Sequence, residues 1–358
     1  MLLIPSAETH RDRARIPSRR AADALQVLLG LGVSAVAVHL LLQAVPLDRL
    51  IGIVVYAQAW VVGLAAAAVL GSLLARAERW RFCFVPNPRP VRFRSALGTL
   101  SISYLVSSIV PLRAGEVVRA VLFGRRESRP VLAAIGSIVL EKWFDFVALV
   151  VLFGGLLTAG AVPQVAMIAG MSAIIVAAGG LGVVVGLVVW RDVTLLLLRT
   201  FEIRLPWRLA RRISLSSRVE QLSAPTDVLR HIQAWARLLV WSAVTWAFAL
   251  ATVWASACAV DVQLGLSAVA VVALVTSVGQ AIPSSPGYVG VYHAATVVAL
   301  SPFGVDPARA LGVAVIAHMV SYGTLMLAGL VSLWAGGYGL GDIRSARRLV
   351  EESSSDAS

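Results

Sequence analysis

Apolar runs, most of them long enough to cross the roughly 30 Å hydrocarbon core of a bilayer, recur along this sequence from residue 24 to residue 334. The chain has 358 residues, of which 58% are hydrophobic and only 14% are charged, and its mean hydropathy is +0.83. A soluble domain of this length does not need so many apolar residues to fill its core. Because the runs recur, one signal peptide or anchor cannot explain them, so the sequence predicts an all-α polytopic membrane protein.

The arginines lie between these runs and predict the orientation. A formal net charge of +12 would suggest a nucleic-acid partner in a soluble protein, but here the positive-inside rule explains it, and we expect no nucleic acid. We expect a multi-pass protein of the cell (inner or cytoplasmic) membrane with both termini in the cytoplasm. The two cysteines, Cys83 and Cys258, are too few for a disulfide or metal framework, and no cofactor is expected. The arginine-rich segments expected inside the cell are 11–20, 76–94, 125–129, 191–235 and 344–348.

Two apolar stretches are interrupted by a Pro-x-x-x-Gly sequence, at Pro111 with Gly115 and at Pro283 with Gly287. As helices, the two legs of the first stretch would be about 24 Å and about 13 Å long, too short to span comfortably. We therefore expect two re-entrant hairpins whose broken tips are buried in protein or line a wet cavity. Beside them we expect about six full spans, at residues 24–45, 53–75, 131–157, 165–190, 236–259 and 309–334.

Two spans, a broken hairpin and one further span occur twice, once from each side of the membrane. This order predicts an inverted repeat, an architecture typical of transporters. The expected parts are a basic cytoplasmic leader at 1–23, a transmembrane domain at 24–335 and a cytoplasmic tail at 336–358. Within that domain the repeats would cover about 24–157 and 165–335, and the cytoplasmic loop 191–235 has room for one amphipathic interfacial helix.

The first hairpin carries three charged residues, Arg113, Glu116 and Arg119, at or near membrane depth. Such groups need partners or a wet cavity. Arg119 follows Glu116 by one helical turn, which predicts a local pair. Arg113 and the free N–H groups around Gly115 would then face an anion such as a phosphate. Alternatively, the tip is shallow and the charges extend to the cytoplasm.

The next span carries a second charged group. Glu141 and Asp145 lie four residues apart on one helix face, and Lys142, the only lysine of the chain, adjoins them. The cluster is either an internal salt-bridge network that fixes helix packing or a contact for a substrate head group, with proton coupling as a third option.

The second hairpin has a small, polar tip at which a ligand could approach the backbone. Two histidines, His293 and His318, stand in apolar surroundings, either as hydrogen-bonded packing residues or as functional groups. The tip residues singled out are Pro283, Ser284, Ser285, Pro286, Gly287 and Gly290.

Three motifs together carry a resemblance to a known family: Pro-x-x-x-Gly-Glu followed by Arg119, Glu141 with Asp145, and Pro-x-Ser-Pro-Gly-x-x-Gly. The sequence resembles the flippase-like transmembrane domain of lysylphosphatidylglycerol synthases, found also in stand-alone membrane proteins, over roughly residues 24–334. The resemblance implies movement of a lipid across the bilayer, an aminoacylated phospholipid in the best-understood members. The motif positions carried over are Arg113, Gly115, Glu116, Arg119, Glu141, Asp145, Pro283, Pro286, Gly287 and Gly290.

Two departures from the family qualify this expectation. Members commonly carry a glutamate at the position of His293 and often an arginine near His318, so this chain has a different substrate or coupling, or has replaced a Glu–Arg pair by two histidines. The chain ends shortly after its last predicted span, so we expect it to lack the soluble aminoacyltransferase domain of the full synthases.

The leading hypothesis is therefore a lipid transporter and not an enzyme. It would bind the anionic, phosphate-containing head group of a phospholipid or polyprenyl-phosphate lipid at the hairpin tips. One alternative is a membrane enzyme acting on such a lipid, although the expected external connections are short and nearly uncharged. The other is a non-transporting scaffold of envelope synthesis. The protein partners we expect for this chain are a second copy of itself or an envelope-synthesis enzyme.

Overall fold

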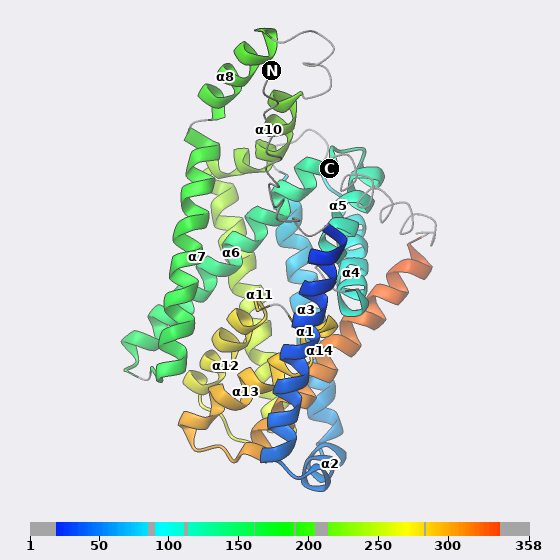
Figure 1. Ribbon diagram of the computed structural model, residues 1–358, viewed down its shortest axis with the longest axis vertical. Helices are drawn as coiled ribbons and strands as arrows, with labels where there is room; N and C mark the ends of the chain where they lie inside the picture. The colour runs from blue at the N-terminus through cyan, green and yellow to red at the C-terminus, as the bar shows by residue number, and fades with distance from the viewer. Residues whose placement is uncertain are drawn as a thin grey trace, which may run out of the picture.

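The structure, a computed structural model, describes residues 19–84, 90–110, 114–160, 162–189, 191–204, 214–282 and 284–336. All regular structure in these ranges is helical, as the sequence predicts (Figure 1). The α-helices are α1 (Arg19–Ala44), α2 (Leu47–Val55), α3 (Ala59–Phe82), α4 (Phe93–Ile109), α5 (Ala114–Glu127), α6 (Val131–Thr158), α7 (Gln164–Val189), α8 (Arg191–Arg204), α10 (Leu215–Ser223), α11 (Ile232–Cys258), α12 (Leu266–Gly279), α13 (Val291–Leu300) and α14 (Pro307–Ala335). The 3₁₀-helices are η1 (Ala224–Arg230), η2 (Pro286–Tyr288) and η3 (Ser301–Phe303).

Four helices in the described part are long and apolar enough to cross a membrane, namely α3, α7, α11 and α14, and the bent pair α1 and α2 makes a fifth candidate. Helix α6 has 28 residues and is about 42 Å long. Every stretch of α6 long enough to span contains Glu141, Lys142 and Asp145. The protein is therefore a multi-pass membrane protein in which α6 brings three charges into the bundle.

The predicted span at 53–75 and the short connection implied between it and the span at 24–45 are wrong in detail. Helix α2 begins directly after Pro46, since proline is tolerated at a helix start, and it is bent by 91° from α1. The chain breaks again before α3, where Gln58 Nε2 donates to Asp261 Oδ1 at 2.7 Å. Helix α3 then runs on to Phe82, because no glycine or proline interrupts it after residue 71.

The helices of the two predicted hairpins are all short of the roughly 30 Å that a span requires. The longest of them, α4, has 17 residues and is about 26 Å long. Helices α4 and α5 lie side by side (Figure 1), and a Cβ atom on Gly115 would collide with the backbone carbonyl of Ser103. Between α12 and α13 the backbone is irregular, with Gly287 at φ +72° and Gly290 at φ +86°.

The predicted cytoplasmic loop 191–235 contains more helix than expected. Helices α8 and α10 and the short η1 occupy most of it, and they lie at one end of the molecule while α2 lies at the other (Figure 1). Helix α10 packs on α6 at Gly136, where an added Cβ atom would collide with the carbonyl oxygen of Leu222. The two elements need a glycine there because their backbones touch.

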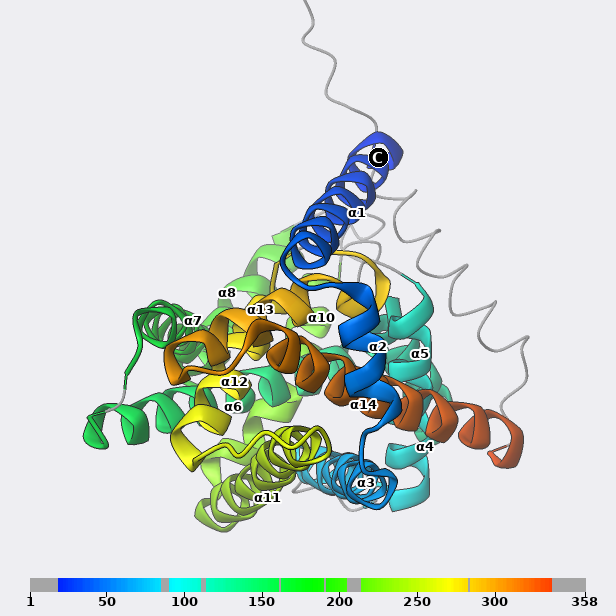
Figure 2. The same ribbon diagram turned by 90° about the horizontal axis from the view of Figure 1, so that it is seen from below.

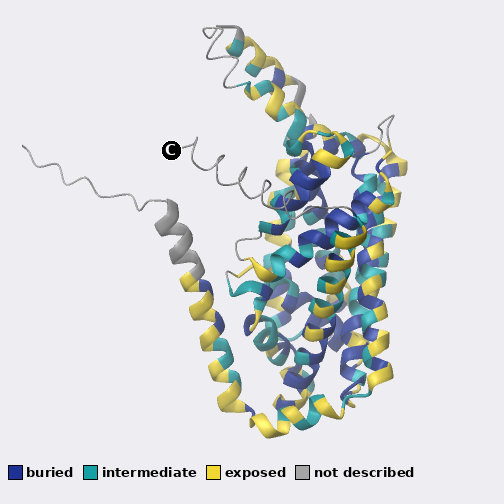
Figure 3. Ribbon diagram, turned by 90° about the vertical axis from the view of Figure 1, so that its right-hand side faces the viewer, coloured by how far each residue is buried: buried dark blue, intermediate teal, exposed yellow. Residues whose placement is uncertain are grey.

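Helix α1 stands apart from the bundle in two views (Figures 2 and 3). Its apolar side chains are exposed, with Leu28 at 66% and Val36 at 59% of full accessibility. Side chains of this kind suit a lipid environment. The buried Ser34 instead contacts the second hairpin, so α1 is joined to the bundle at the tip of that hairpin.

Candidate functional site

Two arginines of α3 meet two carboxylates of α6 inside the bundle. Arg79 is 1% exposed, and its Nη1 donates to Asp145 Oδ1 at 2.8 Å while its Nη2 lies 3.4 Å from Glu141 Oε1. Arg76 Nη1 lies 3.4 Å from Asp145 Oδ2. Ser242 of α11 accepts a further bond from Arg79 Nη1 at 3.1 Å. The two carboxylates thus share one helix face, as their spacing predicts, and they belong to an internal salt-bridge network.

Arg119 brings α5 to the same carboxylates. Its Nη2 lies 2.8 Å from Glu141 Oε2, although without hydrogen-bond alignment. The guanidinium lies 3.7 Å from the centre of the Trp80 ring, and Trp80 Nε1 donates to Ser137 Oγ at 2.9 Å. Stacking on an indole and pairing with a carboxylate hold a guanidinium in one place. Arg119 is therefore a fixed, buried part of the network.

Glu116 and Lys142 form the accessible end of the cluster. Lys142 Nζ lies 3.2 Å from Glu116 Oε1, and the two side chains are 45% and 32% exposed. The predicted local pair of Glu116 with Arg119 is wrong, because α5 directs Arg119 to Glu141 and leaves Glu116 to Lys142. An exposed ion pair is weak and can exchange partners, whereas breaking the buried pairs of Arg79 costs much more free energy.

The charges of this cluster, which we call the ion network, do not balance. Four cations face three carboxylates, so the formal charge of these seven described side chains is +1. A charge held away from water is costly without a counter-ion, and the N-terminus of α5 beside Glu116 adds positive potential. The cations are Arg76, Arg79, Arg119 and Lys142, and the carboxylates are Glu116, Glu141 and Asp145.

The second hairpin packs its tip on α1 through small residues. The backbone N–H of Ser285 donates to Ser34 Oγ at 2.9 Å. A Cβ atom on Gly290 would lie 2.7 Å from the carbonyl oxygen of Ser34, and one on Gly30 would lie 2.8 Å from that of Ser284. The two glycines are needed for this close approach. The hydroxyl of Ser284 is buried and has no hydrogen-bond partner within the described residues.

Behind the tip, the two sequence-predicted histidines meet. The rings of His293 and His318 are stacked with their centres 4.8 Å apart, and His318 stacks in turn on Tyr322 at 4.3 Å. The backbone N–H of Gly290 donates to His293 Nδ1 at 3.3 Å. His318 is 9% exposed, and its Nδ1 finds no partner among the described residues. The histidines therefore lie at the N-terminus of α13, directly behind the hairpin tip.

Tyr104 of α4 links the two groups of residues. Its phenol lies close enough to both Lys142 and Tyr322 to influence each of them electrostatically. The two hairpins also meet, because a Cβ atom added to Gly287 of the second hairpin would lie 3.8 Å from the carbonyl oxygen of Ser108 in α4. The same Cβ atom would lie 3.6 Å from the ring of Tyr322. A series of polar side chains, which we call the polar path, thus runs from Lys142 through Tyr104 and Tyr322 to the histidines.

This region lies within the part of the chain that matches a known family. Residues 27–329 match the family described as the lysylphosphatidylglycerol synthase TM region. The chain belongs to this family. No curated protein matches the chain. Membership places the protein among membrane proteins of the lipid-related synthase or flippase type, which agrees with the resemblance found in the hairpin motifs.

In this member of the family, most of the predicted site residues fall into the ion network or the second hairpin. Arg113 and Pro283 lie outside the described residues, and Pro286 begins η2. Sequence reasoning missed Arg76 and Arg79 by assigning them to a loop. Their spacing of three, on an uninterrupted helix, was the available signal. The spacing of four between His318 and Tyr322 similarly indicated that the two side chains share a face of α14.

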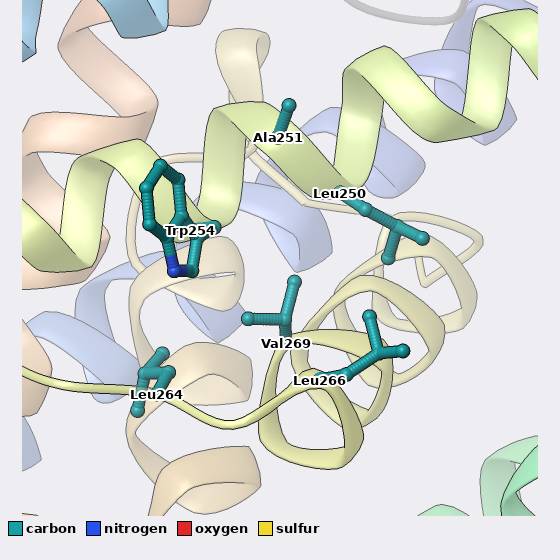
Figure 4. A pocket seen from close by; sticks show the side chains of 6 residues that line it. All are labelled: Leu250, Ala251, Trp254, Leu264, Leu266 and Val269. Atoms are coloured by element: carbon teal, nitrogen blue, oxygen red, sulfur yellow. The ribbon is translucent and has the colours of Figure 1, made fainter.

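A separate pocket of about 300 Å³ lies between α11, α12 and the segment that joins them (Figure 4). Apart from the indole N–H of Trp254, its lining side chains offer no polar group, so this pocket cannot recognise a head group. The lining residues are Leu250, Ala251, Trp254, Leu264, Leu266 and Val269. Among the described residues, no group of histidine, cysteine and acidic side chains is suited to hold a metal ion.

Proposed function

We propose that this protein is a flippase-like transporter of lipids whose head group is anionic and contains a phosphate. One observation carries the proposal: an ion network with a surplus positive charge ends in a partly exposed pair, Lys142 with Glu116. The surplus charge attracts an anion, and Lys142 with Glu116 is the most exposed pair of the described network, where an anion can most easily replace an existing partner. A phosphate would take the place of Glu116 at Lys142, whose compact ammonium can follow it.

The polar path then gives the head group a route to the second hairpin. Tyrosine hydroxyls at Tyr104 and Tyr322 donate hydrogen bonds to an anion without adding a charge. The free N–H groups at the start of α13 are suited to receive the phosphate. The acyl or polyprenyl chains would meanwhile stay in the bilayer. The head group would leave chemically unchanged, so the protein would act as a transporter and not as an enzyme.

The proposed architecture is the one that the sequence predicts, with about six spans, two re-entrant hairpins and an inverted repeat. The short lengths of α4, α5, α12 and α13 and the contact between the hairpin tips support it. Two related hairpins would supply equivalent sites in states that open to opposite sides of the membrane. The arginine-rich end with α8 and α10 would face the cytoplasm of the cell membrane.

The proposal is tested with purified protein in liposomes that contain a trace of fluorescent phosphatidylglycerol or fluorescent phosphatidylcholine. Loss of fluorescence to a membrane-impermeant quencher reports movement between leaflets. We expect faster movement of phosphatidylglycerol, slowed in Lys142→Met and unchanged in Arg199→Met, which alters an exposed pair with Glu220. Equal rates for both lipids, or rates no higher than in empty liposomes, would contradict the proposal. A chemically altered lipid would indicate an enzyme.

A further inference from the structure

The histidine pair has room for only one positive charge. The rings of His293 and His318 are nearly parallel, with an interplanar angle of 20° and centres 4.8 Å apart. Two imidazolium rings at this separation would repel each other strongly in a site of low effective dielectric. The pair can therefore be neutral, or it can hold a single proton.

The observed geometry belongs to a neutral His293. Its Nδ1 accepts from the backbone N–H of Gly290 at 3.3 Å, so a proton added at Nδ1 would replace this contact by a repulsion between two donors. The N-terminus of α13 also carries a positive partial charge. Protonation at this atom would thus release the Gly290 N–H and leave it free for another acceptor.

His318 supplies an independent observation about this site. Its ring is nine-tenths buried, yet its Nδ1 has no hydrogen-bond partner in the described part of the chain. The hydroxyl of Ser284, at the hairpin tip, is likewise buried and without a partner. A buried polar atom without a partner is costly, so each of these two atoms could accept or donate a hydrogen bond to a polar ligand that reaches it.

The protein itself offers no counter-charge at the pair among its described residues. The helices α7 and α12 and the short η3 carry no ionisable side chain. The nearby titratable groups are His39 of α1, bonded to Gln43, and Tyr104, Tyr288, Tyr292 and Tyr322. On the other helices that pack on α14, Arg49 pairs with Asp306, Arg76 and Arg79 pair with Asp145, and Arg81 pairs with Glu78. Arg237 lies over Phe82, and the remaining charged side chains, Asp48, Arg94 and Arg309, are exposed.

We propose that the pair of His293 and His318 binds one proton together with a phosphate-bearing lipid head group at the N-terminus of α13. The proton comes from water and is held by the pair, and the anion supplies the counter-charge that the protein lacks. The released N–H of Gly290 joins the free N–H groups of α13 as a donor to the phosphate. Head-group binding at the second hairpin and proton uptake are then one linked step. This inference rests on the proposed function.

The number of protons taken up on binding is measured by titration calorimetry with a short-chain phosphatidylglycerol. The titration is repeated near neutral pH in buffers that differ in ionisation enthalpy, because the dependence of the measured heat on the buffer gives the protons exchanged. We expect uptake of up to one proton per lipid bound. The uptake is expected to vanish in the double variant His293→Gln with His318→Gln and to persist in His231→Gln, which alters an exposed histidine at the start of α11.

The outcomes separate this inference from the proposed function. Binding without proton uptake would overturn the inference and leave the proposed function standing, whereas no binding of the anionic lipid would contradict the proposed function itself. Uptake with inorganic phosphate but not with the lipid would overturn the lipid assignment. If the double variant does not fold, wild-type protein in liposomes gives the answer, because an imposed pH gradient must then change the rate of lipid movement. An unchanged rate would overturn the inference.

Discussion

Arg79 Nη1 donates to the carboxylate of Asp145 at 2.8 Å, and this contact joins α3 to α6 inside the bundle. The same guanidinium reaches Glu141 through its other terminal nitrogen. Since one buried side chain pairs with both carboxylates of α6, the packing of α3 on α6 depends on it.

Replacing Arg79 by methionine should therefore destabilise the protein strongly. The substitution keeps the length of the side chain but leaves Glu141 and Asp145 short of a partner, and removal of one member of a buried pair typically costs about 3–5 kcal/mol. Thermal unfolding in detergent measures the loss. Arg199→Met, which breaks an exposed pair, is the matched control and should unfold near the wild-type temperature. Equal stability of the two variants would show that the network is not structural.

The two carboxylates should differ in their importance for stability. Glu141 is 2% exposed and Asp145 is 16% exposed, and Glu141 alone neutralises Arg119. Glu141→Gln should thus lower the unfolding temperature more than Asp145→Asn, because it leaves the 4% exposed Arg119 without a carboxylate, whereas Asp145→Asn does so for the 21% exposed Arg76. The comparison uses the two single variants in the same detergent. The reverse order would contradict the pairing described above.

Gly115 should not tolerate a methyl group. Its Cβ atom would collide with the backbone carbonyl of Ser103, so alanine forces α4 and α5 apart, at a cost of about 1–3 kcal/mol typical of overpacking. Gly63→Ala on α3 is the control, because nothing lies within 4 Å of its Cβ position. We expect a lower unfolding temperature for Gly115→Ala and an equal or higher one for Gly63→Ala. Wild-type stability of Gly115→Ala would mean that the two helices do not touch there.

The proposed topology is checked by labelling single cysteines from outside the cell, in a background without Cys83 and Cys258. Cysteines at Thr158 or Asp306 should react with an impermeant reagent, and cysteines at Ser128 or Ser216 should not. Reaction at Ser128 would turn α4 and α5 into a crossing segment and would remove the inverted repeat.

Much of the architecture could be predicted because it follows from local rules. The spacing of Glu141 and Asp145 places both on one face of a helix, and the Pro-x-x-x-Gly sequences mark the broken helices. The break between α2 and α3 could not be predicted in this way. It involves Gln58 and Asp261, which are far apart in sequence and come together only when α3 and α11 pack.

The partners of the charges were also beyond sequence reasoning. Arg119 and Glu116 are one turn apart, so a local pair was the simplest prediction, but burial against α6 favours the longer-range pairs with Glu141 and Lys142. The positive-inside rule assigns Arg79 to a loop, because the rule does not tell a flanking charge from a buried one. The role of Arg113, outside the described residues, stays a prediction.

The central claim is that an anionic head group replaces Glu116 at Lys142. Its most direct test compares substitutions at these two residues, which should change head-group binding in opposite directions. Equilibrium binding of a fluorescent short-chain phosphatidylglycerol to purified protein is measured for the wild type and for Lys142→Met, Lys142→Arg and Glu116→Gln. We expect Lys142→Met to weaken binding about tenfold, because a charge-assisted hydrogen bond contributes about 1.5 kcal/mol or more. Lys142→Arg should retain binding, and Glu116→Gln should bind as tightly as the wild type or more tightly, since it removes the competing carboxylate. Equal weakening in Lys142→Met and Glu116→Gln, or no change in either, would contradict the claim.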